Sequence, residues 1–139
     1  MNYRYEITDH ASAGCVTLRT EVFVDEQGFA EEFDEIDDRA VHLCIYEGDL
    51  PVASGRLYSD DGVCCHIGRV VVAKSHRGRH LGEAVMRRLE EEARRIGYKE
   101  AALSSQDHAI GFYEKMGYAP VGAFYMDQHC PHKRMVKSL

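Results

Sequence analysis

The feature that most constrains this chain is a helical pattern standing between two strand-like runs. The pattern covers residues 80–96, and Gly97 follows its last apolar position. Its apolar stripe consists of Leu81, Ala84, Val85, Leu89, Ala93 and Ile96. A long run at 63–73 precedes it, and a short apolar run at 100–104 follows. This order predicts a parallel, right-handed strand–helix–strand crossover inside a sheet.

The remaining segments predict the elements that complete this sheet. Strands are expected at 3–7, 41–46, 51–58, 118–125 and 133–136, with a turn at 47–49 making the second and third a hairpin. A helix is expected from Ala11 to Val22, capped by Thr8 or Asp9 and closed by Gly28. Another should run from a capping Asp107 to Met116. The fold class is therefore α/β: a single domain over residues 1–139, with a mixed, mostly antiparallel sheet around a central parallel β-α-β unit and helices on both faces.

Charge and composition exclude several classes of protein. The net charge of −6 argues against nucleic-acid binding, which needs clustered cations to neutralise phosphates. No apolar run approaches the roughly 20 residues that span a membrane, and residues 1–6 lack a signal-peptide pattern, so we expect a cytoplasmic protein without membrane contact. The five cysteines are expected to be reduced thiols. His129-Cys130-Pro131-His132 lacks a second ligand pair, so no metal is expected.

The segment between the run at 63–73 and the central helix has the character of an anion site. Residues 74–82 read Lys-Ser-His-Arg-Gly-Arg-His-Leu-Gly. A strand that turns directly into a helix leaves backbone N–H groups unpaired at the helix N-terminus, where the dipole favours an anion. Gly78 and Gly82 allow close backbone approach, and Arg77 and Arg79 add charge. The segment matches neither a P-loop nor a dinucleotide-binding fingerprint. A purely structural basic turn is the alternative.

Two motifs together carry a resemblance to a known family. Arg77-Gly78-Arg79-His80-Leu81-Gly82, then a helix and a strand, then Phe112-Tyr113-Glu114-Lys115-Met116-Gly117-Tyr118, closely resembles the acetyl-CoA site of GNAT superfamily N-acetyltransferases. The resemblance covers nearly the whole chain and is closest to the ElaA/YjcF-like bacterial branch. It is supported by Val22-Phe23-Val24-Asp25-Glu26-Gln27, Glu35-Ile36-Asp37, Ile67-Gly68-Arg69-Val70, Gln106-Asp107-His108-Ala109, and Pro131-His132 with Met135.

The resemblance implies a set of cofactor contacts. The backbone of Val70, Val71 and Val72 is expected to pair with the pantetheine arm of acetyl-CoA, in the manner of an added strand. The pyrophosphate is expected on the loop made of Arg77, Gly78, Arg79, His80, Leu81 and Gly82. Arg77 and Gly82 fill the first and last family positions, whereas His80 replaces the middle glycine. Gln106 stands where many relatives carry a cofactor-contacting asparagine.

Catalytic roles are implied less completely. Tyr113 matches the family's tyrosine near the thioester sulfur, where a phenol can stabilise the departing thiolate; the alternative is a packing aromatic. One family position for a general base is Ala101 here, and another is His66. His66 is expected to share a strand face with Gly68, Val70 and Val72. The alternatives are a structural histidine at 66 and water relaying the proton to Glu26 or Glu35.

The resemblance thus implies an acetyl-CoA-dependent N-acetyltransferase acting on a primary amine by direct transfer in a ternary complex. The acceptor, a small molecule or a peptide, is not specified, and a homodimer is left open. The acidic residues of segment 31–38 either attract a cationic amine or form a solvated face. The rival function is a non-catalytic acyl-CoA-binding regulatory module.

Overall fold

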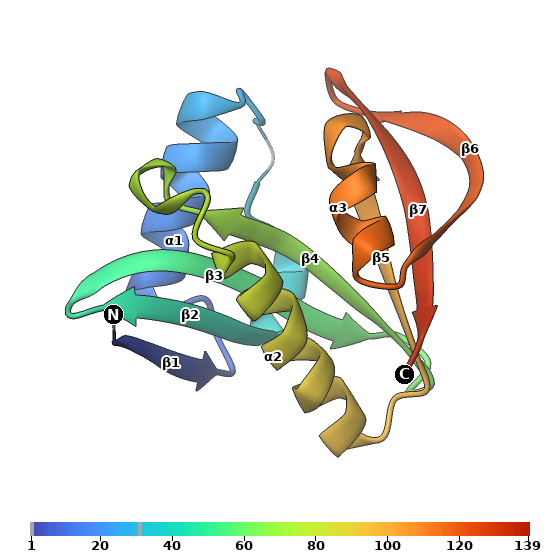
Figure 1. The fold of residues 1–139 in the computed structure, drawn as a ribbon, viewed down its shortest axis with the longest axis horizontal. Coiled ribbons are helices and arrows are strands. Elements are labelled where there is room, and N and C mark those ends of the chain that lie inside the picture. The colour runs from blue at the N-terminus through green and yellow to red at the C-terminus, as the bar shows by residue number, and fades with distance from the viewer. Residues whose placement is uncertain (1, 31) are drawn as a thin grey trace.

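The computed structural model describes residues 2–30 and 32–139, which form one seven-stranded sheet in the order β1-β2-β3-β4-β5-β7-β6 (Figure 1). The strands are β1 Tyr3–Thr8, β2 Val41–Glu47, β3 Leu50–Ser59, β4 Cys64–Val72, β5 Glu100–Gln106, β6 Ala119–Asp127 and β7 Cys130–Ser138. Neighbouring strands pair antiparallel except β4 and β5, which are parallel. The mixed sheet predicted from the sequence is confirmed.

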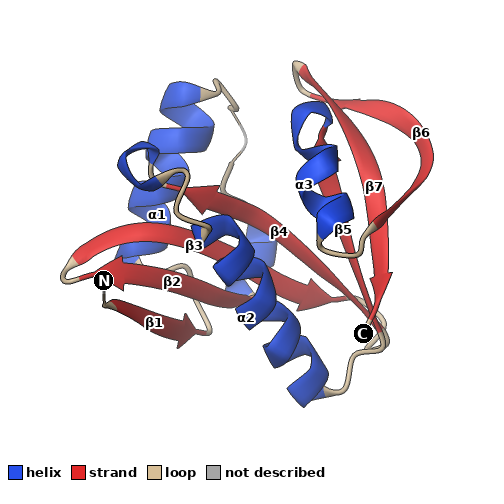
Figure 2. Cartoon of the chain, in the orientation of Figure 1, coloured by secondary structure: helices blue, strands red, loops and turns tan. Residues whose placement is uncertain are grey.

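Helices cover both faces of the sheet, as Figure 2 shows. Helix α2 (Leu81–Ile96) and helix α3 (Ile110–Lys115) pack over one face, and helix α1 (Ala13–Arg19) packs over the other. The core beneath α2 includes Leu43, Ile45, Leu57, Ile67, Val85 and Leu89, all at most 2% exposed. Burying each such side chain contributes about 1.5–3 kcal/mol, so the stripe of α2 holds the parallel unit together.

Two helix starts differ from prediction. Thr8 closes β1, paired with His42, and Ser12 is the cap of α1, accepting a hydrogen bond from the Cys15 amide. The first helix then continues as a π-helical segment, Thr20–Glu26, and the chain reverses at Gly28 with φ +77°. Asp107 does not cap α3; it opens a short 3₁₀ turn, Asp107–Ala109, that precedes the helix. Thr8 does not cap α1 because it belongs to β1, and Asp107 does not cap α3 because it belongs to the 3₁₀ turn.

A β-bulge interrupts β4 and changes which side chains share a face. Ser54 of β3 pairs with Val71, but Arg56 pairs with Gly68, so β4 carries one extra residue between them. Arg69 adopts a left-handed φ of +53° at this point. The extra residue reverses the alternation along the strand. Beyond it, Val70 and Val72 face α2 while Val71 packs in the α1 cluster.

The acidic segment is tied to the sheet by buried ion pairs. Arg19 is 1% exposed; its Nε lies 2.9 Å from Glu32 Oε2, and its Nη1 lies 2.7 Å from Asp37 Oδ1. Arg56 Nη1 donates to Asp34 Oδ1 at 2.7 Å and to Asp37 Oδ1 at 2.8 Å. Three acids of the segment are thus neutralised by arginines. Glu35 and Asp38 are exposed, while Glu31 lies outside the described residues.

The remaining sequence expectations concern thiols, metals and membranes. All five cysteines are free thiols, and Cys15, Cys44 and Cys65 are buried in the core. Within residues 2–30 and 32–139, no three His, Cys, Asp or Glu side chains gather as metal ligands would. In the same part of the chain, none of the helices combines the length and apolar character needed to cross a bilayer.

Candidate active site

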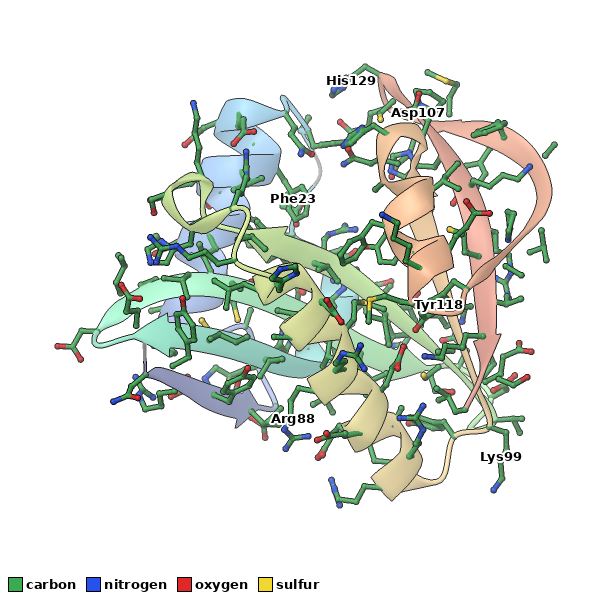
Figure 3. The ribbon with its side chains drawn as sticks, viewed as in Figure 1. Phe23, Arg88, Lys99, Asp107, Tyr118 and His129 are labelled. Atoms are coloured by element: carbon green, nitrogen blue, oxygen red, sulfur yellow. The ribbon has the colours of Figure 1, made fainter. Side chains whose placement is uncertain are left out.

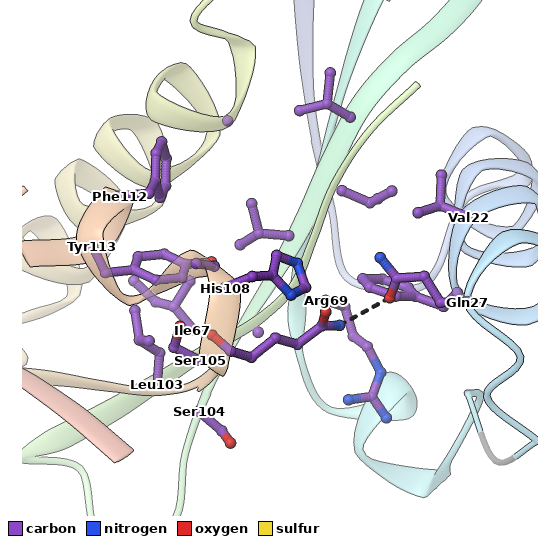
Figure 4. Close-up of a pocket in the computed structure, with 18 of the residues that line it drawn as sticks. Val22, Gln27, Ile67, Arg69, Leu103, Ser104, Ser105, His108, Phe112 and Tyr113 are labelled. Atoms are coloured by element: carbon purple, nitrogen blue, oxygen red, sulfur yellow. Dashed lines mark hydrogen bonds between the residues drawn. The ribbon is translucent and has the colours of Figure 1, made fainter. Parts of the chain in front are cut away.

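The central cavity opens where the two parallel strands separate. In the described chain, the β4–β5 ladder comprises three pairs, from Cys64–Glu100 to His66–Ala102. Beyond them the strands diverge, and a cavity of about 720 Å³ lies between Ile67–Val72 of β4 and Leu103–Gln106 of β5 (Figure 4). The pairing groups of β4 on this side therefore face a cavity instead of a strand. An extended, amide-bearing ligand can satisfy them as a neighbouring strand would.

Val70, Val71 and Val72 all line this cavity. Their side chains also belong to the core clusters on the two faces, so the part of them that a ligand between the strands would meet is the backbone. That the pantetheine arm pairs with this backbone stays a prediction of the family resemblance.

The predicted anion loop lies at one end of the cavity. Of its residues, Arg77, Gly78, His80, Leu81 and Gly82 line the cavity, and Arg79 does not. Helix α2 begins at Leu81, so its free N–H groups open onto this loop. Gly78 has φ +84°, a conformation that favours glycine. The loop therefore combines a helix N-terminus, a permissive glycine and cationic side chains.

His80 occupies the left-handed region at the N-cap of α2, with φ +60°. A glycine adopts this conformation without cost, which gives a physical reason for the family's preference. The His80 side chain is 86% exposed, with Nδ1 3.7 Å from Glu83 Oε2, so the histidine is accommodated by pointing into solvent.

The two arginines of the loop already have acidic partners. Arg77 Nη1 and Nη2 each donate to a Glu26 oxygen at 2.9 Å, and its Nε donates to the Val72 carbonyl at 3.3 Å. The hydrogen bond from Arg77 lowers the pKa of Glu26, which is therefore a weak proton acceptor. Arg79 Nη1 lies 3.8 Å from Glu47 Oε2. An anion that binds here must share or displace the Glu26 carboxylate.

Gly82 stands where α2 approaches α3. A Cβ on Gly82 would lie 3.5 Å from Phe112 Cζ and 3.7 Å from Val72 Cγ2. A small side chain therefore fits against the protein, whereas a larger one must extend into the cavity that Gly82 lines.

Tyr113 lines the cavity from α3, on the opposite side from the first helix (Figure 4). Its ring packs edge-to-face against Phe112 and Tyr118, so the predicted packing role and the cavity position coexist. Burial raises the pKa of Tyr113 to about 12. The phenol is therefore protonated at neutral pH and can donate a hydrogen bond into the cavity.

Gln106 lines the cavity and bridges it. Its Nε2 donates to Gln27 Oε1 at 2.9 Å, the interaction that is dashed in Figure 4. Because Gln27 follows the first helix, this bond joins the two sides of the cleft. Figure 3 shows Phe23, another cavity residue, extending from the first helix toward the same gap.

His66 does not join this group. It is absent from the cavity lining, and its ring stacks on Tyr58 with centroids 5.0 Å apart. The expected shared face with Val70 and Val72 is wrong, because the bulge at Arg69 puts His66 and Gly68 on the face of Val71. Of the two relay carboxylates, Glu26 is bound by Arg77, and Glu35 is exposed and does not line the cavity.

The structure adds cavity residues that sequence reasoning gave no role. They include Phe29, Arg69, Ser104, Asp127 and His132, and Glu32 of the acidic segment lies beside them in the cavity lining. They come from the first-helix side, the bulge, β5 and the β6–β7 hairpin. Pro131-His132 carried a signal in the sequence, because it matched the branch motif, but a local motif does not reveal that β7 brings His132 to the cavity.

Comparison with known proteins gives matches over most of the chain. Residues 7–118 match the Acetyltransferase (GNAT) family. The uncharacterized N-acetyltransferase YjcF of Bacillus subtilis is 37% identical over 123 residues, which cover 86% of this chain and 87% of that protein.

Solved structures agree. An acyl-CoA N-acyltransferase from Pseudomonas aeruginosa is 29% identical with a TM-score of 0.87, covering 98% of this chain and 99% of that one. ElaA from Escherichia coli is 27% identical with a TM-score of 0.84 and the same coverage.

Proposed function

Because the chain belongs to the GNAT family of acetyltransferases, we propose that it transfers the acetyl group of acetyl-CoA to a primary amine by direct transfer in a ternary complex. The observation that carries this proposal is the cavity between the separated ends of β4 and β5. It runs from the cationic loop at the start of α2 to the hydroxyl-bearing side chain of Tyr113. A phosphate end, a strand-like edge and a proton donor are the three features that an acyl-CoA thioester requires.

The residues fit acetyl-CoA in the following way. Arg77, Gly78 and Gly82, with the N-terminus of α2, would hold the pyrophosphate. The β4 backbone at Val70–Val72 would pair with the pantetheine amides. Gln106 would donate to the arm after exchanging its bond to Gln27. Bound in this way, acetyl-CoA supplies an activated acyl carbon with a thiolate leaving group.

The chain's own groups then assist transfer. Backbone N–H groups of the separated β4 edge stabilise the negative charge that develops on the carbonyl oxygen. The protonated Tyr113 phenol donates to the sulfur as the C–S bond breaks. A cysteine-linked intermediate is not proposed, because the five cysteines do not line the cavity.

The acceptor is proposed to be an amine on a small molecule or a peptide. The acidic segment offers less attraction for a cation than its composition suggests, because Glu32, Asp34 and Asp37 are paired with arginines. Asp127, half-exposed at the cavity, is better placed to attract a cationic amine. We also propose that the protein forms a homodimer, which sedimentation of the purified protein tests.

The deciding experiment is a panel of small amines, amino sugars, polyamines and peptides incubated with acetyl-CoA. Release of free thiol with an acetylated product in the mass spectrum supports transfer. The rival, a non-catalytic acyl-CoA-binding module, is favoured by Ala101 and by the position of His66, which remove both family base positions from the cavity. That module would bind CoA but release no thiol above background with every amine.

A further inference from the structure

Acetyl transfer to an amine requires a group that accepts the amine proton, and this group must line the cavity. Several titratable side chains at the phosphate end are already engaged. Glu26 gives both oxygens to Arg77, and Glu83 accepts from Arg87 at 2.6 Å. Both ring nitrogens of His76 have partners, Ser75 Oγ at 2.7 Å and Glu47 Oε1 at 3.2 Å. His80 also lines this end, but its side chain is 86% exposed and points into solvent, so we sought the proton acceptor at the other end.

His132 is the buried histidine of that end. It is 6% exposed, lines the cavity, and pairs in register with Gln106 across β5 and β7. The rings of Phe29 and Tyr125 lie near it, with centroids 6.3 Å and 6.1 Å away. Strand β7 therefore places the His132 imidazole in the cavity lining, near two aromatic rings and beside Gln106.

One hydrogen bond determines which ring nitrogen carries the proton. His132 Nδ1 lies 2.9 Å from the carbonyl oxygen of Cys130. A carbonyl can only accept, so Nδ1 must donate, and the neutral ring then has its lone pair on Nε2. The ring is thus oriented as a proton acceptor.

Asp127 lies where it can stabilise the protonated ring. Its Oδ2 is 4.0 Å from His132 Nε2, and Asp127 pairs with Cys130 at the end of the β6–β7 hairpin. Besides the Tyr125 phenol, the other charged or titratable groups at this end include Glu32, Arg69, His108 and its partner Asp107. Glu32 Oε2 is held by Arg19 and Arg69, each at 2.9 Å. His108 is 68% exposed and lies 3.6 Å from Asp107.

We propose that His132 Nε2 accepts the acceptor's amine proton, directly or through one water, with Asp127 as its positioning residue. This inference rests on the proposed acetyl transfer. The amine nitrogen bonds to the thioester carbonyl carbon, and the C–S bond breaks with its electron pair on sulfur. The nitrogen's proton passes to Nε2, and the ring later returns it to solvent. The CoA thiolate leaves while the Tyr113 hydroxyl donates a hydrogen bond to its sulfur.

The first test is a pair of variants measured across pH with the best acceptor of the amine panel. His132→Asn keeps a donor for the Cys130 carbonyl but removes Nε2. We expect kcat/KM for the amine to fall about 10²- to 10⁴-fold, with loss of the acid limb of the pH profile and unchanged CoA affinity. Asp127→Asn should lower kcat for the amine while leaving the KM for acetyl-CoA unchanged, because the carboxylate 4.0 Å from Nε2 no longer orients the ring and stabilises its protonated form. His129→Gln, in the same hairpin but outside the cavity lining, is the matched control.

Each outcome of these measurements either supports or overturns the assignment of His132 as the proton acceptor. A parent-like pH profile in His132→Asn overturns the assignment, and so does loss of the acid limb in His108→Asn in its place. A parent protein that acetylates no amine refutes the proposed function instead. Nitrogen-15 NMR of the imidazole then tests His132 independently of turnover: a neutral ring that carries its proton on Nε2 overturns the inference, because Nε2 could then not accept a proton.

Discussion

Replacing Gly82 separates the stability of the anion loop from its binding role. A Cβ at this position meets Phe112 and Val72 at 3.5 and 3.7 Å, which are ordinary contact distances. Gly82→Ala therefore causes no clash, and the helix gains up to about 1 kcal/mol because alanine is the better helix former. The two further methyl groups of Gly82→Val must extend into the cavity, where the backbone would approach the pyrophosphate.

The cost to binding follows from the interaction that is blocked. A hydrogen bond between a backbone N–H and a charged group contributes about 1.5–3 kcal/mol. Since about 1.4 kcal/mol corresponds to a factor of ten, loss of one such bond weakens CoA binding about 10- to 100-fold in Gly82→Val. The valine variant should nevertheless melt within a few degrees of the parent.

Isothermal titration with CoA, together with thermal melting, measures both quantities. Gly111→Val is the matched control, because Gly111 is also helical, has open space around its Cβ and does not line the cavity. It should leave CoA affinity unchanged. If folded Gly82→Val binds CoA as the parent does, the loop is a structural turn and the acetyl-CoA assignment loses its phosphate site.

Three other changes probe separate parts of the structure. Tyr113→Phe should lower kcat about 10²-fold while CoA affinity persists, because the ring stays and only the donor to sulfur is lost; equal turnover in a thiol-release assay would leave Tyr113 a packing residue. His80→Gly should raise the melting temperature, because glycine adopts φ +60° without strain; a lower value contradicts this reasoning. Burial would raise the pKa of Asp37, but bonds from Arg19 and Arg56 lower it to about 2. Its folded pKa is thus below the unfolded value, so its contribution of about 2 kcal/mol is present above pH 4 and lost as pH falls toward 2. Denaturation of Asp37→Asn should show a flatter acid dependence there.

Local patterns predicted much of the fold and part of the site. The α2 stripe, the three valines of β4 and the glycine-containing loop are short-range signals, because periodicity and backbone freedom act within a few residues. The bulge at Arg69 has no such signal: a single extra residue in a left-handed conformation is visible only once β3 is paired. That one residue made the expected face of His66 wrong.

Long-range pairing explains the other gaps. Arg19, Asp37 and Arg56 are far apart in sequence, so composition suggested an acidic face where the fold makes compensated pairs. The cavity position of His132 depends on β7 lying beside β5, and residues 133–136 alone understate that strand. The family motif marked Pro131-His132 without giving it a chemical task.

The three-pair ladder between β4 and β5 also has a mechanical meaning. Strands β1 to β4 form one half of the sheet and β5 to β7 form the other. The two halves are hydrogen-bonded through this ladder at one end only and diverge at the other end. Across the open end, the side chains of Gln27 and Gln106 are joined by a single hydrogen bond. A ligand that forms hydrogen bonds with the free edge of β4 would extend this ladder and hold the two halves of the sheet more rigidly. Loading the donor would then set the spacing between the first helix and the β6–β7 hairpin, which is the width available to the second substrate.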